Sequence, residues 1–470
     1  YNLRRSGLLP PETTVLGYSR RPLSDDDFRN LARESVDAHS RVKVEPGLWD
    51  DFVEGVFYQP GDFADKNAYR DLAERLEQID AARGTRGNRL FYLATPPSSY
   101  TDIVANVGRV RLDKQGAREG WARLVIEKPF GHDLASAVAL NDELNKVLDE
   151  SQVYRIDHYL GKETVRNLLV FRFGNGIFEP LWNRRYVDHV QITVSESVGV
   201  GHRGGFYEEA GALRDIVQNH VLQVLALTAM EPPATIDAQG IRDEKVKLLR
   251  AVDIMSPEEV ASNVVRAQYD EGLVDGEKAI AYRSEEGVAA DSDTETFVAL
   301  RLSVDNWRWA GVPFYVRTGK RLHRRVTEVA LQFTRVPHLP FAAALSRGLG
   351  PNTLVLRIQP DEGVTLRFGA KVPGQSFEVR SVSMEMDYDE EFGAEPAEAY
   401  QRLLLDAMAG DPTLFIRSDE VHQAWRIVEP ILTAWETEGA VPLCTYPAGS
   451  WGPRDADLLL ARGGDRWRDL

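Results

Sequence analysis

Residues 155–163 carry side chains that could bind a small anion and move a proton. The segment has the sequence RIDHYLGKE and holds two acids, one imidazole, two cations and a phenol. That composition suits a surface that binds a small, highly oxygenated anion better than it suits a core. The alternative is a solvated helix start, in which Asp157, His158 and Lys162 simply face water.

A second candidate for proton chemistry is His220. It falls on the apolar side of an expected helix over 206–230, where a histidine can simply be a core residue. However, residues 214–220 place five polar side chains within seven positions of that helix. Burying such groups costs a few kcal/mol each unless they are paired. A substrate cavity would pair them, so His220 is a candidate general base.

Two cations follow expected strands. Arg20 comes after the strand 13–18, where an acidic residue would hold the ribose of NAD. An arginine there accommodates a 2′-phosphate and favours NADP, the alternative being a solvated Arg20–Arg21 pair. Lys128 follows the strand 122–126, and Pro129 ends that strand and restricts the lysine backbone.

The elements that must position these residues alternate between strand and helix over 12–150. Such alternation predicts a parallel, doubly wound sheet, in which ligands bind beyond the carboxyl ends of the strands. The expected strands are 13–18, 90–94 and 122–126, and the expected helices begin near 24, 66 and 133.

The remainder of the chain has a different pattern. Strands with period-2 alternation follow one another from 190 onward with few helices between them, and helices return over the last 75 residues. We therefore expect a large, mostly antiparallel sheet with packed helices. The predicted organisation is a dinucleotide-binding, Rossmann-like domain over 1–153 and a substrate-binding and oligomerisation α+β domain over 154–470.

Five segments together resemble the glucose-6-phosphate dehydrogenase family. RIDHYLGKE is similar to the substrate-site signature of the family, and RDIVQNH at 214–220 is similar to its catalytic helix. EKPFG at 127–131, RTGK at 317–320 and YPAGSWGP at 446–453 resemble three further motifs of the family, in the same order.

The resemblance implies oxidation of glucose 6-phosphate at C1 to 6-phosphogluconolactone, with hydride transfer to NADP, the first oxidative step of the pentose phosphate pathway. His220 then matches the general base, and Asp157 matches the carboxylate that orients it. An imidazole that titrates near neutrality is a suitable base, and a carboxylate at its other nitrogen fixes the tautomer.

The same resemblance implies the ligand-binding residues. Arg325 and Gln359 match ligand-binding positions of the family less closely than the other residues do. The expected substrate-binding side chains are His158, Tyr159, Lys162, Glu196, Asp215, Lys320, Arg325 and Lys128. The expected coenzyme-binding side chains are Arg20, Tyr100 and Lys128.

One family feature is absent from this sequence. A strand followed by a glycine-rich turn should present backbone N–H groups to the coenzyme pyrophosphate, and no downstream segment can replace it. Residues 1–3 match the helix that would follow that turn. We therefore expect the dinucleotide-binding domain to be truncated at its first strand, the alternative being a defective relative that has lost the turn.

Composition excludes several classes of protein. The net charge of −16 argues against nucleic-acid binding. The sequence contains no run of 18 apolar residues, so no membrane span is expected. With Cys444 as the single cysteine, neither an internal disulfide nor a cysteine-rich metal site is expected. We expect a cytoplasmic homodimer or homotetramer without a metal.

Two alternatives to the expected enzyme remain. A non-catalytic sugar-phosphate-binding regulator could keep the phosphate ligands, although it would not need both His220 and Asp157. A dehydrogenase of an unphosphorylated sugar would leave the cations His158, Lys162 and Lys320 without a counter-charge.

Overall fold

The computed structural model describes residues 1–470 except 41, 114–119, 341–348, 375–377, 394–397 and 438–440. The chain packs into two compact units. Unit 1 comprises Tyr1–Gly131, Ala135–His158 and Glu398–Ser418, and unit 2 comprises His132–Leu134, Tyr159–Ala397 and Asp419–Leu470. This division differs from the predicted boundary at 153/154. Residues 398–418 belong to unit 1 because strand β16 (Phe415–Ile416) pairs there with strand β5 (Val153–Ile156).

Unit 1 contains two small sheets. Strands β3, β4 and β5 are parallel, and β16 adds to β5 in the antiparallel direction, in the order β16-β5-β4-β3. Strands β1 and β2 form a separate parallel pair. The bounds are β1 Val15–Ser19, β2 Val56–Pro60, β3 Arg89–Leu93, β4 Ala122–Ile126, β5 Val153–Ile156 and β16 Phe415–Ile416.

A slot lined by both apolar and polar residues lies between these two sheets. It has a volume of about 230 Å³ and is lined on one side by Leu16 and Tyr18 of β1 and on the other by residues 90–93 of β3. Leu72 and Ile103 from neighbouring helices also line it. Among the strands that the structure describes, β1 pairs only with β2 and β3 only with β4. The slot is thus flanked by two strand edges.

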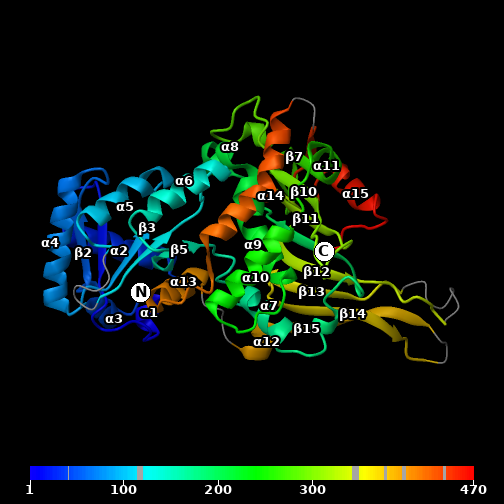
Figure 1. Ribbon diagram of the computed structural model, residues 1–470, viewed down its shortest axis with the longest axis horizontal. Helices are drawn as coiled ribbons and strands as arrows, with labels where there is room; N and C mark the ends of the chain where they lie inside the picture. Colours follow the sequence, from blue (N-terminus) through cyan, green and yellow to red (C-terminus); the bar gives the residue numbers. More distant parts are fainter. Residues whose placement is uncertain (41, 114–119, 341–348, 375–377, 394–397, 438–440) are drawn as a thin grey trace. The chain divides into compact units, whose positions relative to one another are not determined.

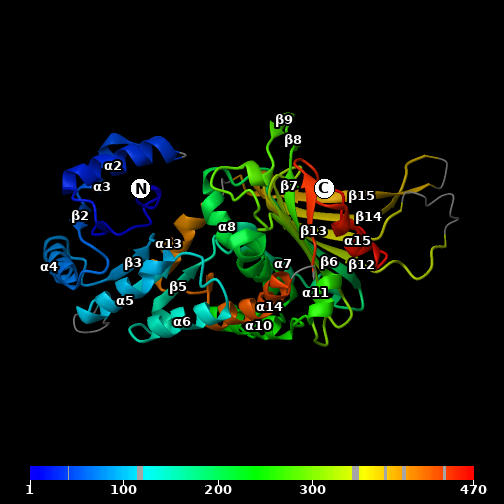
Figure 2. The same ribbon diagram turned by 90° about the horizontal axis from the view of Figure 1, so that it is seen from above.

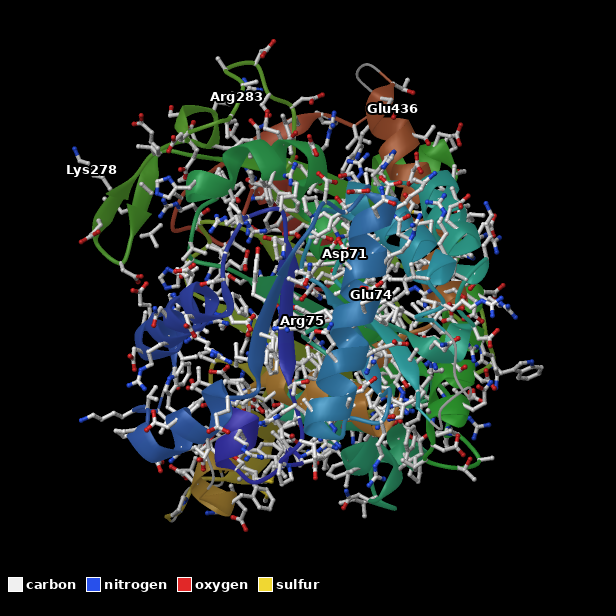
Figure 3. All side chains as sticks on the ribbon, turned by 90° about the vertical axis from the view of Figure 1, so that its left-hand side faces the viewer. Asp71, Glu74, Arg75, Lys278, Arg283 and Glu436 are labelled. Atoms are coloured by element: carbon white, nitrogen blue, oxygen red, sulfur yellow. The ribbon has the colours of Figure 1, made fainter. Side chains whose placement is uncertain are left out.

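Helix α4 of unit 1 is amphipathic. In α4, Leu72 and Ile79 are buried, whereas Asp71 and Glu74 are exposed and Arg75 is half-buried. Figure 3 labels Asp71, Glu74 and Arg75 on this helix. Arg75 also binds Asp25, at 2.8 Å, in the first turn of α2. The bounds are α1 Asn2–Arg5, α2 Asp25–His39, α3 Pro46–Val53, α4 Lys66–Arg83, α5 Tyr100–Arg109, α6 Leu134–Asn145 and α13 Ala399–Ala409.

Unit 2 is built on a nine-stranded sheet of order β15-β14-β13-β12-β6-β11-β10-β7-β17 (Figure 1). The pairing is antiparallel except for β6 with β11 and β7 with β17, which agrees with the predicted mostly antiparallel sheet. The bounds are β6 Val187–Ser195, β7 Val264–Asp270, β10 Phe297–Leu302, β11 Phe314–Gly319, β12 Val326–Phe333, β13 Thr353–Gln359, β14 Gly363–Lys371, β15 Val379–Asp387 and β17 Leu443–Pro447. A separate hairpin pairs β8 Gly272–Val274 with β9 Glu277–Ala279.

Helices of unit 2 pack with one another and against this sheet. Helix α9 contacts both α7 and α10 (Figure 1), and α7 contacts β13 (Figures 1 and 2). The bounds are α7 Glu163–Phe173, α8 Gly204–Ala212, α9 Leu222–Ala229, α10 Ala238–Ala251, α11 Pro257–Asn263, α12 Tyr388–Phe392, α14 Ser418–Glu436 and α15 Arg454–Ala461. Short 3₁₀ turns cover η1 Pro97–Ser99, η2 Glu150–Gln152, η3 Glu179–Leu181, η4 Gly201–Arg203 and η6 Tyr282–Ser284. No helix in the part of the chain that the structure describes is long and apolar enough to cross a membrane.

The single helix expected over 206–230 is instead three segments. Helix α8 ends at Ala212, a π-helix (η5) covers Leu213–Val221, and α9 follows. The break occurs because Gly211 has φ 64° and ψ 173°, a conformation outside the helical region. The prediction of one regular helix was therefore wrong at this point.

The C-terminal segment is held to the sheet by hydrogen bonds and by stacking. Gln191 of β6 donates to the carbonyl of Arg466 and accepts from the N–H of Arg468, both at 2.8 Å. The guanidinium of Arg317 in β11 lies 4.4 Å from the ring centre of Trp467. These contacts fix the chain end beside β6 and β11.

Candidate active site

Arg20 directly follows β1 and is exposed. Tyr58 of β2 holds the turn that carries it, because its hydroxyl donates to the carbonyl of Arg21 at 2.8 Å and lies 2.8 Å from Ser19 Oγ. A cation is thus presented just beyond the carboxyl end of β1. In doubly wound sheets this is where a coenzyme ribose is contacted.

Three tyrosines hold the backbone and side chain of Glu127, the residue before Lys128. Tyr92 donates to one carboxylate oxygen of Glu127, and Tyr400 donates to the other at 3.3 Å. Tyr100 donates to the Glu127 carbonyl at 3.1 Å. Burial raises the pKa of Tyr100 to about 12, so its hydroxyl stays protonated and able to donate. Tyr100, expected to contact the coenzyme, therefore fixes the Lys128 segment.

The peptide bond between Lys128 and Pro129 is cis. Lys128 follows the carboxyl end of β4, and Asp157 and His158 follow the carboxyl end of β5. Since β4 and β5 are parallel neighbours, these three side chains start from the same edge of the unit 1 sheet. They are the sequence-predicted residues that unit 1 brings together.

Strand pairing gathers a second group of predicted residues at one edge of the unit 2 sheet. Ser195, which ends β6, pairs with Gly319 at the end of β11 and with Val326 at the start of β12. Thr327 of β12 pairs with Gln359 at the end of β13. The residues at or just beyond these ends therefore lie at one edge of the sheet: Glu196, Lys320, Arg325 and Gln359.

Two cations converge on one amide oxygen at this edge. Lys162 donates to Gln359 Oε1, and Arg325 Nη2 donates to the same oxygen at 3.1 Å. The amide nitrogen of Gln359 donates to Thr327 Oγ1 at 2.8 Å, which fixes the orientation of the amide. Lys162 also directly precedes the N-terminus of α7, where helix dipoles favour anions. The arrangement suits a group rich in acceptor oxygens, such as a phosphate.

The buried His220 belongs to this same region. Its ring stacks on Tyr159 with a centroid distance of 4.3 Å and an angle of 21° between the ring planes. The Lys162 ammonium lies 4.3 Å from the Tyr159 ring centre. The phenol therefore connects the imidazole to the cation, so His220 adjoins the anion-binding residues and is not enclosed only by apolar core.

Lys320 and Glu196 form an ion pair at the ends of β11 and β6. The Lys320 ammonium lies 5.1 Å from the ring centre of Tyr207, and its carbonyl accepts a hydrogen bond from Tyr446 at 2.6 Å. Burial, and then the charges of Asp215 and Glu295, raise the pKa of Tyr207 well above its usual value. The Lys320 ammonium of this ion pair therefore lies near the ring of Tyr207, whose hydroxyl is protonated and uncharged.

Several further residues build this region, and most of them lie outside the sequence motifs. Thr327 and Tyr207 gave no signal, since neither lies in a quoted motif. Tyr446 opens the YPAGSWGP segment, whose place in that motif could have indicated its role. Glu295 lies in the acidic stretch DSDTET, which resembles a solvated loop, yet its side chain is buried.

Two family models match successive parts of the chain. Residues 1–167 match the NAD binding domain of glucose-6-phosphate dehydrogenase, and residues 169–468 match the C-terminal domain of the same enzyme. The chain belongs to the glucose-6-phosphate dehydrogenase family. The resemblance noted from its motifs is therefore confirmed.

Relatives in this family match along the whole chain. The glucose-6-phosphate 1-dehydrogenase 2 of Mycobacterium tuberculosis is 50% identical over 469 residues, which cover 100% of this chain and 90% of that protein. The glucose-6-phosphate 1-dehydrogenase of Aggregatibacter actinomycetemcomitans is 48% identical over 468 residues, 100% of this chain and 93% of that protein.

Solved structures of glucose-6-phosphate dehydrogenases share the fold. One, in complex with its substrate glucose 6-phosphate, has a TM-score of 0.90 and 35% identity, covering 100% of this chain and 94% of that one. The enzyme from Mycobacterium avium has a TM-score of 0.84 and 37% identity, with the same coverage. The predicted fold class, a dinucleotide-binding domain followed by a larger mixed domain, is confirmed.

Proposed function

We propose that this protein oxidises glucose 6-phosphate at C1 to 6-phosphogluconolactone and transfers the hydride to NADP, as an oxidoreductase of the pentose phosphate pathway. Membership of the family supports the reaction. The observation that carries the proposal for this chain is the convergence of Lys162 and Arg325 on one oxygen, beside the stacked rings of Tyr159 and His220.

In this proposal the amide oxygen of Gln359 occupies the place that a substrate phosphate oxygen would take. Lys162, Arg325, Tyr159 and His158 bind the phosphate. Glu196 and Asp215 accept hydrogen bonds from sugar hydroxyls, and Lys320 and Lys128 donate to sugar and phosphate oxygens. Charge-assisted bonds of this kind are about twice as strong as neutral ones.

His220 acts as the general base. Its imidazole takes the proton of the C1 hydroxyl, the C1–H bond breaks, and C1 becomes the carbonyl carbon of the lactone. Asp157 orients the imidazole and stabilises its protonated form. The nicotinamide coenzyme, when bound, accepts the hydride. Arg20 and Lys128 would bind the anionic groups of the coenzyme, because each follows the carboxyl end of a strand in unit 1, β1 and β4 respectively.

The direct test is the formation of NADPH by the purified protein. We expect turnover with glucose 6-phosphate and little with free glucose at the same concentration. Binding of the sugar phosphate without turnover would favour the non-catalytic regulator. Equal rates with both sugars would favour a dehydrogenase of unphosphorylated sugars.

Coenzyme choice provides a separate prediction. Arg20→Ala is expected to weaken NADP use strongly and NAD use little, because the planar guanidinium can bond two oxygens of the 2′-phosphate and stack on the adenine. The measurement is kcat/KM for each coenzyme at fixed ionic strength, since salt screens exposed charges. Arg33→Ala, which removes a cation from the middle of α2, is the matched control. An unchanged NADP-to-NAD ratio in Arg20→Ala would identify Arg20 as a solvated arginine.

We further propose that residues 1–153 form a dinucleotide-binding domain that has room for one more strand. The slot between β1 and β3 supports this, because a strand there would pair with both edges and join the two sheets. A glycine-rich turn after such a strand would present N–H groups to the pyrophosphate.

This second proposal is tested by extending the chain at its N-terminus. An apolar strand followed by a glycine-rich turn should raise the melting temperature and the affinity for NADP. A Gly/Ser extension of equal length is the control. If both extensions behave alike, the slot does not receive a strand.

We also infer a cytoplasmic homodimer or homotetramer. Exposed apolar side chains on the edge strand β15, Val382 and Met384, support self-association. Such patches often mark interfaces. Measuring the molar mass in solution tests the inference, and a monomer at micromolar concentration would contradict it.

A further inference from the structure

Glu295 contacts the point where α8 meets the π-helix η5. The residue lies just before β10 and its side chain is 4% exposed. Its Oε1 accepts from the N–H of Leu213 at 2.8 Å, and its main-chain carbonyl accepts from the N–H of Ala212 at 3.0 Å. One residue from another part of unit 2 thus binds two successive N–H groups at the start of η5.

The break in the helix at Gly211 makes room for this carboxyl group. A Cβ atom at Gly211 would lie 2.4 Å from Glu295 Oε1 and 2.7 Å from Oε2, too close for any side chain. The φ of 64° is also a value that favours glycine. The close approach and the backbone conformation therefore require glycine at the same position.

We propose that Glu295 is a positioning residue for the dehydrogenase reaction: by holding the first turn of η5, it sets where Asp215 and His220 lie. Asp215 is two residues and His220 seven residues beyond Leu213, on the same π-helix. A rotation or slip of its first turn would therefore move both side chains. This inference rests on the function proposed above.

The charge on Glu295 bears on how firmly it holds η5. Burial raises the pKa of Glu295 to about 7, while the hydrogen bond from Leu213 and the guanidiniums of Arg214 and Arg266 act in the opposite direction. The charge of Glu295 in turn contributes to the raised pKa of Tyr207 on α8. Ionised carboxylates accept stronger hydrogen bonds than neutral groups, so the individual bond from Leu213 is strongest above neutral pH. Because burial raises the pKa of Glu295, the same ionisation lowers the stability of the folded protein as the pH rises through about 7.

The test compares Glu295→Leu with Glu295→Gln in the full chain. It measures kcat and the KM values for glucose 6-phosphate and NADP over about two pH units on either side of neutrality. Glu295→Leu is expected to lower kcat at least about tenfold, the loss typical of one charge-assisted hydrogen bond, with little change in the KM for NADP. Glu295→Gln keeps an acceptor oxygen and should restore most of kcat. It should also change the pH profile of kcat near neutrality.

Asp293→Asn is the matched control, because this carboxyl lies on the same loop but is exposed. Gly211→Ala should resemble Glu295→Leu, and it provides a second variant if Glu295→Leu does not fold. A folded Glu295→Leu protein with the wild-type kcat, or an unaltered pH profile in Glu295→Gln, would overturn the inference. Wild-type turnover is measured first, so a failure of the proposed function would be recognised separately.

Discussion

Replacement of His220 by Asn is expected to lower kcat by a factor of about 10² to 10⁴, the usual contribution of a general base. The KM for glucose 6-phosphate should change little. Asn retains a polar side chain of similar width at this buried position but cannot take a proton. The ring of Tyr159, which stacks on His220, would keep its place against Thr327 and Gln359.

The measurement is steady-state turnover together with thermal unfolding, so that a loss of fold is distinguished from a loss of chemistry. His189→Asn is the matched control, because His189 is also fully buried but lies near the opposite end of β6 from Glu196. His189→Asn should lower the melting temperature, whereas the folded fraction of that variant should keep the wild-type kcat. If His220→Asn keeps its turnover within a few-fold, His220 is a core histidine and the proposed mechanism is wrong.

The second large effect is expected from the residues that bind the phosphate. Lys162→Ala should raise the KM for glucose 6-phosphate by a factor of about 10 to 100, since a charge-assisted hydrogen bond contributes about 1.5–3 kcal/mol. Arg325→Ala should act in the same direction. Free glucose has no phosphate, so kcat/KM for glucose should hardly change in either variant.

Lys278→Ala is the control for the loss of a positive charge. Lys278 is exposed on the hairpin β8–β9 (Figure 3) and should have no effect on either sugar. All assays need the same ionic strength, because the chain has a net charge of −16. Equal losses with glucose and with glucose 6-phosphate would mean that Lys162 and Arg325 do not contact the phosphate.

Several elements could be predicted from short stretches of sequence. The expected strand over 122–126 is β4 with the same bounds, and the helix expected to begin near 66 is α4 at Lys66–Arg83. The apolar run over 90–94 became β3 at Arg89–Leu93. These predictions succeeded because an element of this length is specified by the periodicity of its own side chains and by nearby stop signals such as Pro96.

Other features depended on residues far away in the sequence. The periodicity of 206–230 is helical throughout, yet Gly211 interrupts it because Glu295 approaches its backbone from a separate loop. Residues 398–418 belong to unit 1 because β16 pairs with β5, some 260 positions earlier. No local pattern in either segment indicates those partners.

The sequence by itself therefore determined the chemistry of the candidate site: which side chains could bind an anion, and which imidazole could take a proton. A motif of a few neighbouring residues is enough to indicate which side chains could bind an anion or take a proton. Only the tertiary structure decided that Lys162 and Arg325 share one oxygen of Gln359. Their meeting depends on the register of β12 with β13 and on where α7 begins. Register is set by the packing of the whole sheet, because a one-residue slip would turn every side chain of a strand to the other face.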